Sequence, residues 1–113
     1  MTIREMVQEI QGEIAKGNLM PERAAELLTQ LAALLGNVNE RMLECDMSYN
    51  KALLFWLENE IKANKAKIHA ECTPEYRNKI EARNTKELTL ELIRSLKYFF
   101  NEREEEFRVA KYQ

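Results

Sequence analysis

An apolar stripe with spacings of three and four residues runs through the middle of this 113-residue chain. Its members are Leu28, Leu31, Leu35, Val38, Met42, Cys45, Tyr49, Ala52 and Trp56. Such steps average 3.5 residues, which keeps one face of an α-helix turned toward a partner. No proline lies between Pro21 and Pro74, so we predict one very long central helix over residues 21–72. At ~1.5 Å per residue this helix would be about 75 Å long.

Gly36 and Asn37 are the weak point of this predicted helix. Glycine in a helix interior costs ~1 kcal/mol relative to alanine, and Asn37 could cap a new helix. The spacing of three and four residues between apolar side chains nevertheless continues from Leu35 to Val38 without interruption. We therefore predict a continuous helix and keep a kink at 36–39 as the alternative.

Helix signals are found on both sides of the central helix. Thr2 and Glu5 have the spacing of a capping box, and Thr73 followed by Pro74 is typical of a helix start. The predicted helices cover about residues 2–16, 21–72, 74–82 and 86–110. No strand-like alternation occurs between them. We therefore expect an all-α protein, an elongated antiparallel helical bundle or coiled-coil hairpin, in a single domain over residues 1–113.

The composition agrees with a helical bundle that lies outside the membrane. The chain is 32% charged and has only three glycines and two prolines. Its longest apolar run, LLFWL at 53–57, is much shorter than the ~20 residues of a membrane span, and we expect the centre of the core around it. The first ten residues lack the pattern of a signal peptide, and two cysteines form no disulfide framework. These features favour a cytoplasmic protein without membrane contact.

No residue set with the spacing of a catalytic or metal site is found. His69 and Cys72 could supply two ligands of a zinc site, but no second pair completes it. Cys45 lies on the apolar stripe, where a small buried side chain is the simplest interpretation. The glycines are isolated, so no phosphate-binding loop is present. We therefore expect no enzymatic activity, no metal and no cofactor.

The length of the central helix predicts self-association. The last helix, about residues 86–110, would span only ~38 Å and could not cover the whole stripe. The stripe residues left over must be covered by the first helix, by another subunit or by a partner. They form the predicted oligomer or partner seam: Leu28, Leu31, Leu35, Val38 and Met42. We therefore predict a homodimer that also binds another, unidentified protein.

A basic stretch provides an alternative function. The first 60 residues carry 5 Lys and Arg against 10 Asp and Glu, whereas the rest carry 12 against 9. The candidate nucleic-acid contacts are Lys62, Lys65, Lys67, Arg77, Lys79, Arg83, Lys86, Arg94 and Lys97. Phosphate binding by such a cluster is sensitive to salt and independent of sequence. Tyr76 is the only aromatic residue among the cations of 62–86, although single-strand binding usually employs several stacking rings.

Three segments resemble a known group of proteins: Asp46-x-x-Tyr49, ANKAKIHAE at 63–71, and LTLELIRSLKYFFNEREEE at 88–106. Over about residues 40–108 the chain resembles small all-helical proteins encoded in bacteriophage and prophage genomes. The resemblance implies a cytoplasmic accessory protein and transfers no catalytic residue. It also implies a partner that is a replication or recombination component, or a host defence factor. Neither Gly36-Asn37 nor the LLFWL cluster has a counterpart in that pattern.

Overall fold

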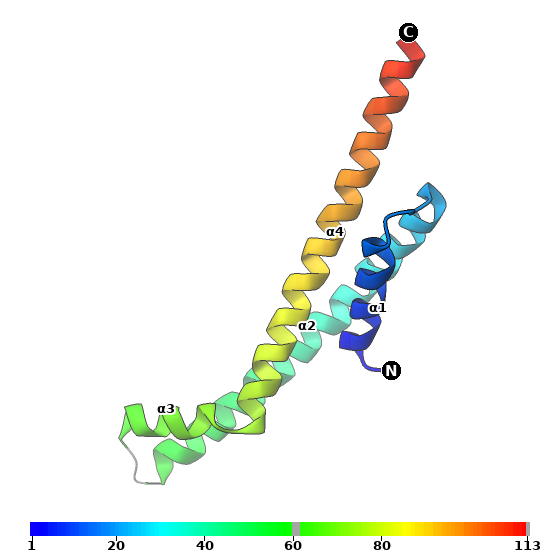
Figure 1. Cartoon of the computed structure of the whole chain (residues 1–113). Helices are drawn as coiled ribbons and strands as arrows, with labels where there is room; N and C mark the ends of the chain where they lie inside the picture. The colour runs from blue at the N-terminus through cyan, green and yellow to red at the C-terminus, as the bar shows by residue number, and fades with distance from the viewer. Residues whose placement is uncertain (60–61, 113) are drawn as a thin grey trace. The chain divides into compact units, whose positions relative to one another are not determined.

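The computed structural model describes residues 1–59 and 62–112, with side chains as far as Arg103. Within these residues the chain forms four helices and no strand (Figure 1). The helices are α1 (Ile3–Ala15), α2 (Pro21–Glu58), α3 (Ala63–Glu71) and α4 (Pro74–Tyr112). The predicted all-α fold class is therefore confirmed.

The helices are divided between two compact units. Unit 1 comprises Met1–Leu35 and Glu87–Gln113, and unit 2 comprises Gly36–Lys86. Unit 1 thus contains α1 with the first part of α2 and the later part of α4. Unit 2 contains the rest of α2, all of α3 and the start of α4. We describe each unit by itself.

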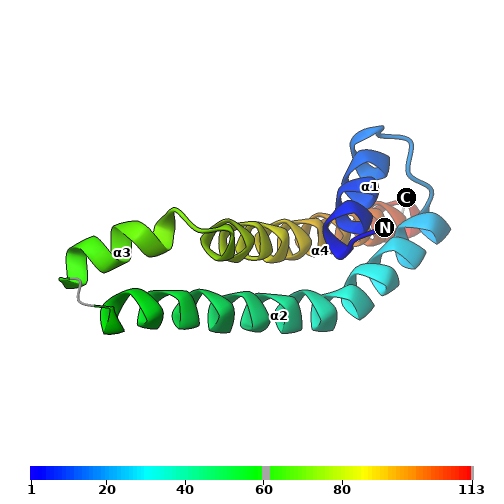
Figure 2. The ribbon, with the colours of Figure 1, turned by 90° about the horizontal axis from the view of Figure 1, so that it is seen from below.

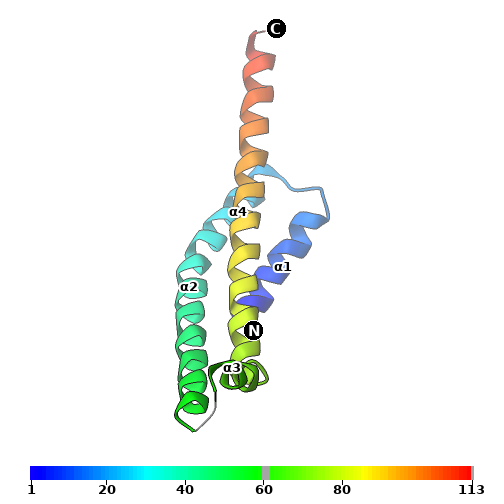
Figure 3. The same cartoon turned by 90° about the vertical axis from the view of Figure 1, so that its left-hand side faces the viewer.

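The core of unit 1 is built by three helices. Its buried residues are Val7, Ile10, Ala24, Leu27, Leu31, Leu92 and Leu96. They recur at spacings of three and four residues within each helix, as expected when one face of each helix turns inward. Figure 3 shows α1 beside this part of α4. Burial of these side chains is the main favourable contribution to the stability of this unit.

Local signals in the sequence determine where α1 begins and ends. The backbone N–H of Glu5 donates to Thr2 Oγ1 at 3.1 Å, which forms the predicted N-cap. After the helix, Gly17 adopts a φ of 89°, a conformation that glycine enters without the steric cost of a side chain. The predicted first helix is therefore confirmed within one residue at each end.

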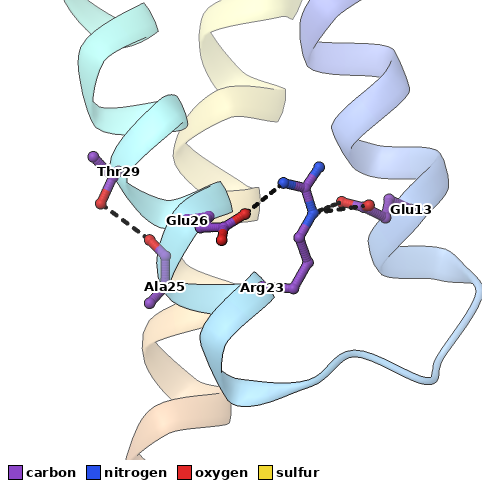
Figure 4. A network of polar contacts seen from close by, with 5 residues as sticks. All are labelled: Glu13, Arg23, Ala25, Glu26 and Thr29. Atoms are coloured by element: carbon purple, nitrogen blue, oxygen red, sulfur yellow. Dashed lines mark hydrogen bonds and ion pairs between the residues drawn. The ribbon is translucent and has the colours of Figure 1, made fainter.

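Arg23 links α1 to α2 on the surface of unit 1 (Figure 4). Its Nε donates to Glu13 Oε1 at 3.0 Å and Oε2 at 3.1 Å. Its Nη1 donates to Glu26 Oε2 at 2.8 Å. Because all three side chains are at least one-third exposed, water screens their attraction and this network contributes little to stability. The apolar core, and not this ion pair, holds α1 in place.

Helix α2 continues through Gly36 without interruption, which confirms the prediction of a continuous helix at this point. Gly36 is exposed, and a β-carbon built on it would meet no atom within 4 Å. Gly36→Ala should therefore raise the free energy of unfolding by about 1 kcal/mol, because alanine has the higher helix propensity. Urea denaturation monitored by circular dichroism measures the change.

Gly17 provides the matched control for this substitution. A β-carbon at Gly17 would also find open space, but its φ is +89°. Gly17→Ala should therefore lower the free energy of unfolding, because an L-residue is strained in that conformation. A destabilising Gly36→Ala would contradict a continuous helix at that position.

The predicted extension of this helix to residue 72 is wrong, because α2 ends at Glu58. The side chain of Asn59 donates from Nδ2 to the backbone oxygen of Phe55 at 2.7 Å, and its own N–H donates to the same oxygen at 3.2 Å. Both bonds satisfy a carbonyl oxygen in the last turn of α2, where the intrahelical ladder of hydrogen bonds ends. Residues 63–71 form the separate helix α3.

The predicted break between residues 82 and 86 is also wrong. Residues 74–112 form the single helix α4. The hydroxyl of Thr85 donates to the backbone oxygen of Glu81 at 2.9 Å, which is the local bond that a threonine inside a helix can make. Thr85 is buried, so its side chain serves the packing of α4 and does not cap a new helix.

Unit 2 is packed around small side chains. Its buried residues are Val38, Cys45, Tyr49, Ala66, Ala70, Ala82 and Thr85. The alanines leave room for α3 to approach its neighbours closely. The rings of Trp56 on α2 and His69 on α3 stack with centroids 4.5 Å apart. Helix α3 therefore folds back beside the end of α2 (Figure 2).

Candidate interaction surfaces

The predicted oligomer seam lies largely inside the chain. Leu31 is 0% and Val38 is 1% exposed, whereas Leu28, Leu35 and Met42 are half-buried. Leu31 belongs to the core of unit 1, and Leu28 packs against that core. The chain's own helices therefore cover Leu31 and Val38, which is one of the alternatives expected for this seam, and these two residues are not available to a second copy or a partner.

A second apolar stripe occupies the exposed face of α2. Leu43 is 60%, Met47 59%, Leu54 53% and Leu57 42% exposed. With Asn50, which is also exposed, these residues have spacings of four, three, four and three. They share a face of α2 opposite to the one that buries Cys45 and Tyr49. We call Leu43, Met47, Asn50, Leu54 and Leu57 the outer stripe.

The sequence shows the outer stripe only when both faces of α2 are considered. The apolar cluster at 53–57 suggested the centre of the core, but Leu54, Phe55 and Leu57 are 53%, 56% and 42% exposed. That expectation is wrong because α2 carries apolar residues on two opposite faces in this stretch. Only one of the faces is covered within the chain.

Unit 2 also contains a cavity of about 450 Å³ among α2, α3 and α4. Leu53 and Leu57 of α2 and Ile80 of α4 contribute apolar walls. Tyr49 and Tyr76 complete this side of the cavity, with ring centroids 5.5 Å apart. The cavity therefore offers a mostly apolar surface to a ligand.

The charged groups of the unit 2 cavity are mainly positive. Lys67 lies on α3, and Lys79 and Arg83 lie one turn apart on α4, with Glu71 as the single carboxylate. Among the described residues, neither Lys67 nor Arg83 forms an ion pair. The cavity therefore has an excess of positive charge that favours an anionic group.

Lys79 and Tyr49 contact each other in the lining of this cavity. The Lys79 ammonium lies 4.3 Å from the centroid of the Tyr49 ring, a cation–π contact. Burial raises the pKa of the Tyr49 hydroxyl above its ordinary value, and the charges of Glu71 and Tyr76 add to this effect. The phenol is therefore neutral at physiological pH and can donate a hydrogen bond.

Unit 1 has a larger cavity with no such preference in charge. Its volume is about 800 Å³. The ionisable residues that line it are Glu9, Glu13, Lys16 and Arg23, so its charges balance. Arg23 and Glu13 also bind each other. This cavity gives no indication of a ligand class.

The structure places the predicted nucleic-acid contacts in two groups. Lys67, Lys79 and Arg83 line the unit 2 cavity. The others are exposed except the half-buried Lys86: Lys62, Lys65, Arg77, Lys86, Arg94 and Lys97. Arg94 and Lys97 belong to unit 1, whereas the remaining seven residues belong to unit 2. The sequence thus located the cations of the cavity, but it did not indicate the apolar walls beside them.

Within residues 1–59 and 62–112, no helix has the length and apolar character that a membrane span requires. No group of three or more histidine, cysteine, aspartate or glutamate side chains is arranged there to hold a metal ion. Comparison with protein-family models finds no match, and neither the curated proteins nor the solved structures give one. The outer stripe and the cavity of unit 2 are therefore the candidate functional surfaces of this chain.

Proposed function

We propose that this chain is a non-enzymatic interaction module that binds a protein by packing a helix against the outer stripe. The observation that carries the proposal is the exposure of four large apolar side chains at heptad spacing on one face of α2. Contiguous exposed apolar patches on soluble proteins mark surfaces that bind a partner. Heptad spacing fits a partner that is itself an α-helix.

The partner that this surface fits best is the outer stripe of a second copy, aligned parallel and in register. Asn50 lies in the middle of the stripe, and its amide needs a group that both donates and accepts hydrogen bonds. In a parallel pair Asn50 faces Asn50 of the other copy, whereas an antiparallel pair would set it against Met47. A polar side chain buried in such a seam disfavours registers that set it against an apolar side chain, because its amide would then lack a hydrogen-bond partner.

The charges that flank the outer stripe are compatible with the same pairing. Asp46 precedes Met47 along α2, and Lys51 follows Asn50. In a parallel coiled coil, residues at these two flanking positions meet across the interface, five residues apart in sequence. Asp46 of each copy would then face Lys51 of the other. These pairs favour the parallel homodimer over arrangements that bring like charges together.

The sequence resemblance extends this proposal to a second partner. Residues 40–108 include the whole outer stripe and resemble phage-encoded helical proteins. We infer that the homodimer binds a replication or recombination component, or a host defence factor, in the cytoplasm. Self-association through the outer stripe is the part of the proposal that can be tested directly.

Leu54→Asp should weaken self-association about tenfold to 100-fold. Full burial of a leucine contributes about 1.5–3 kcal/mol. Each Leu54 has about half of its surface left to bury, and the homodimer contains two, so the total loss is about 1.5–3 kcal/mol, with 1.4 kcal/mol corresponding to a factor of ten. Sedimentation equilibrium over a range of concentrations measures the dimer dissociation constant. Circular dichroism should show unchanged helix content, because Leu54 is 53% exposed in the single chain.

Ser48→Asp is the matched control, since Ser48 is exposed on α2 outside the outer stripe. It adds the same charge to the same helix and should leave the dimer unchanged. If the wild-type chain has the mass of one copy at every concentration, self-association is excluded. If Ser48→Asp separates the copies as effectively as Leu54→Asp, the interface lies elsewhere.

A further inference from the structure

We propose that the unit 2 cavity binds an anionic amphiphile, a carboxylate or phosphate group carried on an apolar body. This site lies among α2, α3 and α4 and is separate from the pairing of outer stripes, although Leu57 borders both. The proposal depends on three features of the cavity: its volume, its charge and its apolar walls.

The volume suits a small molecule. Cavities that bind such ligands measure ~300–1,000 Å³, and the cavity of unit 2 has about 450 Å³. The cavity of unit 2 therefore lies within the range of small-molecule sites, and a dodecyl chain with a carboxylate head group is a suitable probe of it.

The charge of the cavity selects an anion. Three cations, Lys67, Lys79 and Arg83, oppose the single carboxylate of Glu71. Lys67 and Arg83 have no ion-pair partner among the described residues, and the Lys79 ammonium is positioned over the Tyr49 ring. The unit 1 cavity differs, because equal numbers of acidic and basic residues line it. An anionic head group would thus find charge-assisted donors on both α3 and α4.

The walls select an apolar body. Leu53, Leu57 and Ile80 line the same cavity as the cations, together with two tyrosine rings. A bare phosphate ion would leave these walls in contact with water, whereas an alkyl chain would cover them. Apolar contact favours binding in proportion to the area removed from water. The ligand is therefore expected to need both an anionic head group and an apolar body.

A nucleic-acid strand fits this cavity less well. Tyr49 is 6% exposed, and one face of its ring is occupied by Lys79. Tyr76 is half-buried against Tyr49. Stacking of successive bases needs accessible ring faces, which neither tyrosine offers fully. We therefore favour the amphiphile and treat an oligonucleotide as a competing outcome of the test.

The test uses the full chain and four small probes below their micelle concentrations. Dodecanoate and dodecyl phosphate carry an anionic head, dodecyltrimethylammonium carries a cationic one, and inorganic phosphate lacks the chain. Trp56 is the only tryptophan and stacks on His69 of α3, so its fluorescence reports on this part of unit 2. The two anionic amphiphiles should titrate to saturation, and inorganic phosphate should bind at least tenfold more weakly. The relative affinity of the two anionic probes then distinguishes a carboxylate from a phosphate ligand.

Lys67→Gln and Arg83→Gln should each weaken dodecanoate binding about tenfold, because each removes one charged donor from the cavity. Both side chains are exposed, so the fold should be retained, as circular dichroism can verify. Lys65→Gln on α3 and Arg77→Gln on α4 are the matched controls, since these exposed residues do not line the cavity. They should leave the affinity unchanged.

Three results would overturn the proposal. Equal binding of dodecyltrimethylammonium and dodecanoate would indicate nonspecific adsorption of alkyl chains. Unchanged dodecanoate affinity in both Lys67→Gln and Arg83→Gln would place the ligand outside the cavity. Binding of a thymidine oligonucleotide without binding of dodecanoate would assign the cations to nucleic acid.

Discussion

Leu31→Ala is expected to lower the free energy of unfolding by about 2–5 kcal/mol. Leu31 is 0% exposed at the centre of the unit 1 core. Its truncation removes buried apolar area and leaves a space that α1, α2 and α4 can close only in part. Because typical domains are stable by about 5–15 kcal/mol, this loss would remove a large share of the total.

Leu43→Ala is the matched control for Leu31→Ala. Leu43 is a leucine of the same helix but is 60% exposed, so its truncation should change the free energy of unfolding by less than about 0.5 kcal/mol. Urea denaturation measures both variants below the concentration at which the chain associates. Amide hydrogen exchange should also become faster in α1 for Leu31→Ala, because α1 is held by the same core. Equal effects of the two substitutions would contradict the placement of Leu31 in the core.

Tyr49→Ala should destabilise unit 2 by about 3–5 kcal/mol, the usual cost of deleting a buried aromatic ring. Tyr49 is 6% exposed, and it contacts the ring of Tyr76 and the ammonium of Lys79. Its loss would remove the aromatic contact between α2 and α4 in this unit. Hydrogen exchange should therefore become faster in α3 and in the first turns of α4.

Tyr98→Ala and Tyr49→Phe are the two controls for this prediction. Tyr98 is 65% exposed on α4, so its removal should cost less than about 0.5 kcal/mol. Tyr49→Phe keeps the buried ring and removes only the hydroxyl, so it should retain most of the stability. A loss in Tyr49→Phe as large as in Tyr49→Ala would show that the hydroxyl, and not ring packing, stabilises unit 2.

The helix boundaries illustrate how far local signals can be trusted in this chain. Thr2 caps the start of α1 and Gly17 follows its end, because capping and left-handed glycine are decided within a few residues. Asn59 and Thr85 are also residues that can end a helix or remain inside it. Asn59 bonds to the backbone at the end of α2, whereas Thr85 bonds back within α4. Their different outcomes depend on surroundings that the local sequence does not contain.

The candidate surfaces also depend on contacts that the local sequence does not contain. Leu31 and Leu43 both lie on apolar stripes of α2, and nothing in their spacing distinguishes them. Leu31 is buried by α1 and α4, whereas Leu43 is exposed. The cavity likewise depends on Lys67 and Arg83, which lie 16 positions apart on α3 and α4. They meet at one cavity only because the two helices pack together in unit 2.

Periodicity, capping residues and the scarcity of proline and glycine are properties of short segments, and they alone determined that this chain is helical and that α2 passes through Gly36. The tertiary structure decided which face of α2 is covered, where α2 stops, and which cations share a cavity. These features arise from contacts between residues distant along the chain, and their free energies exceed the small local preferences of single residues.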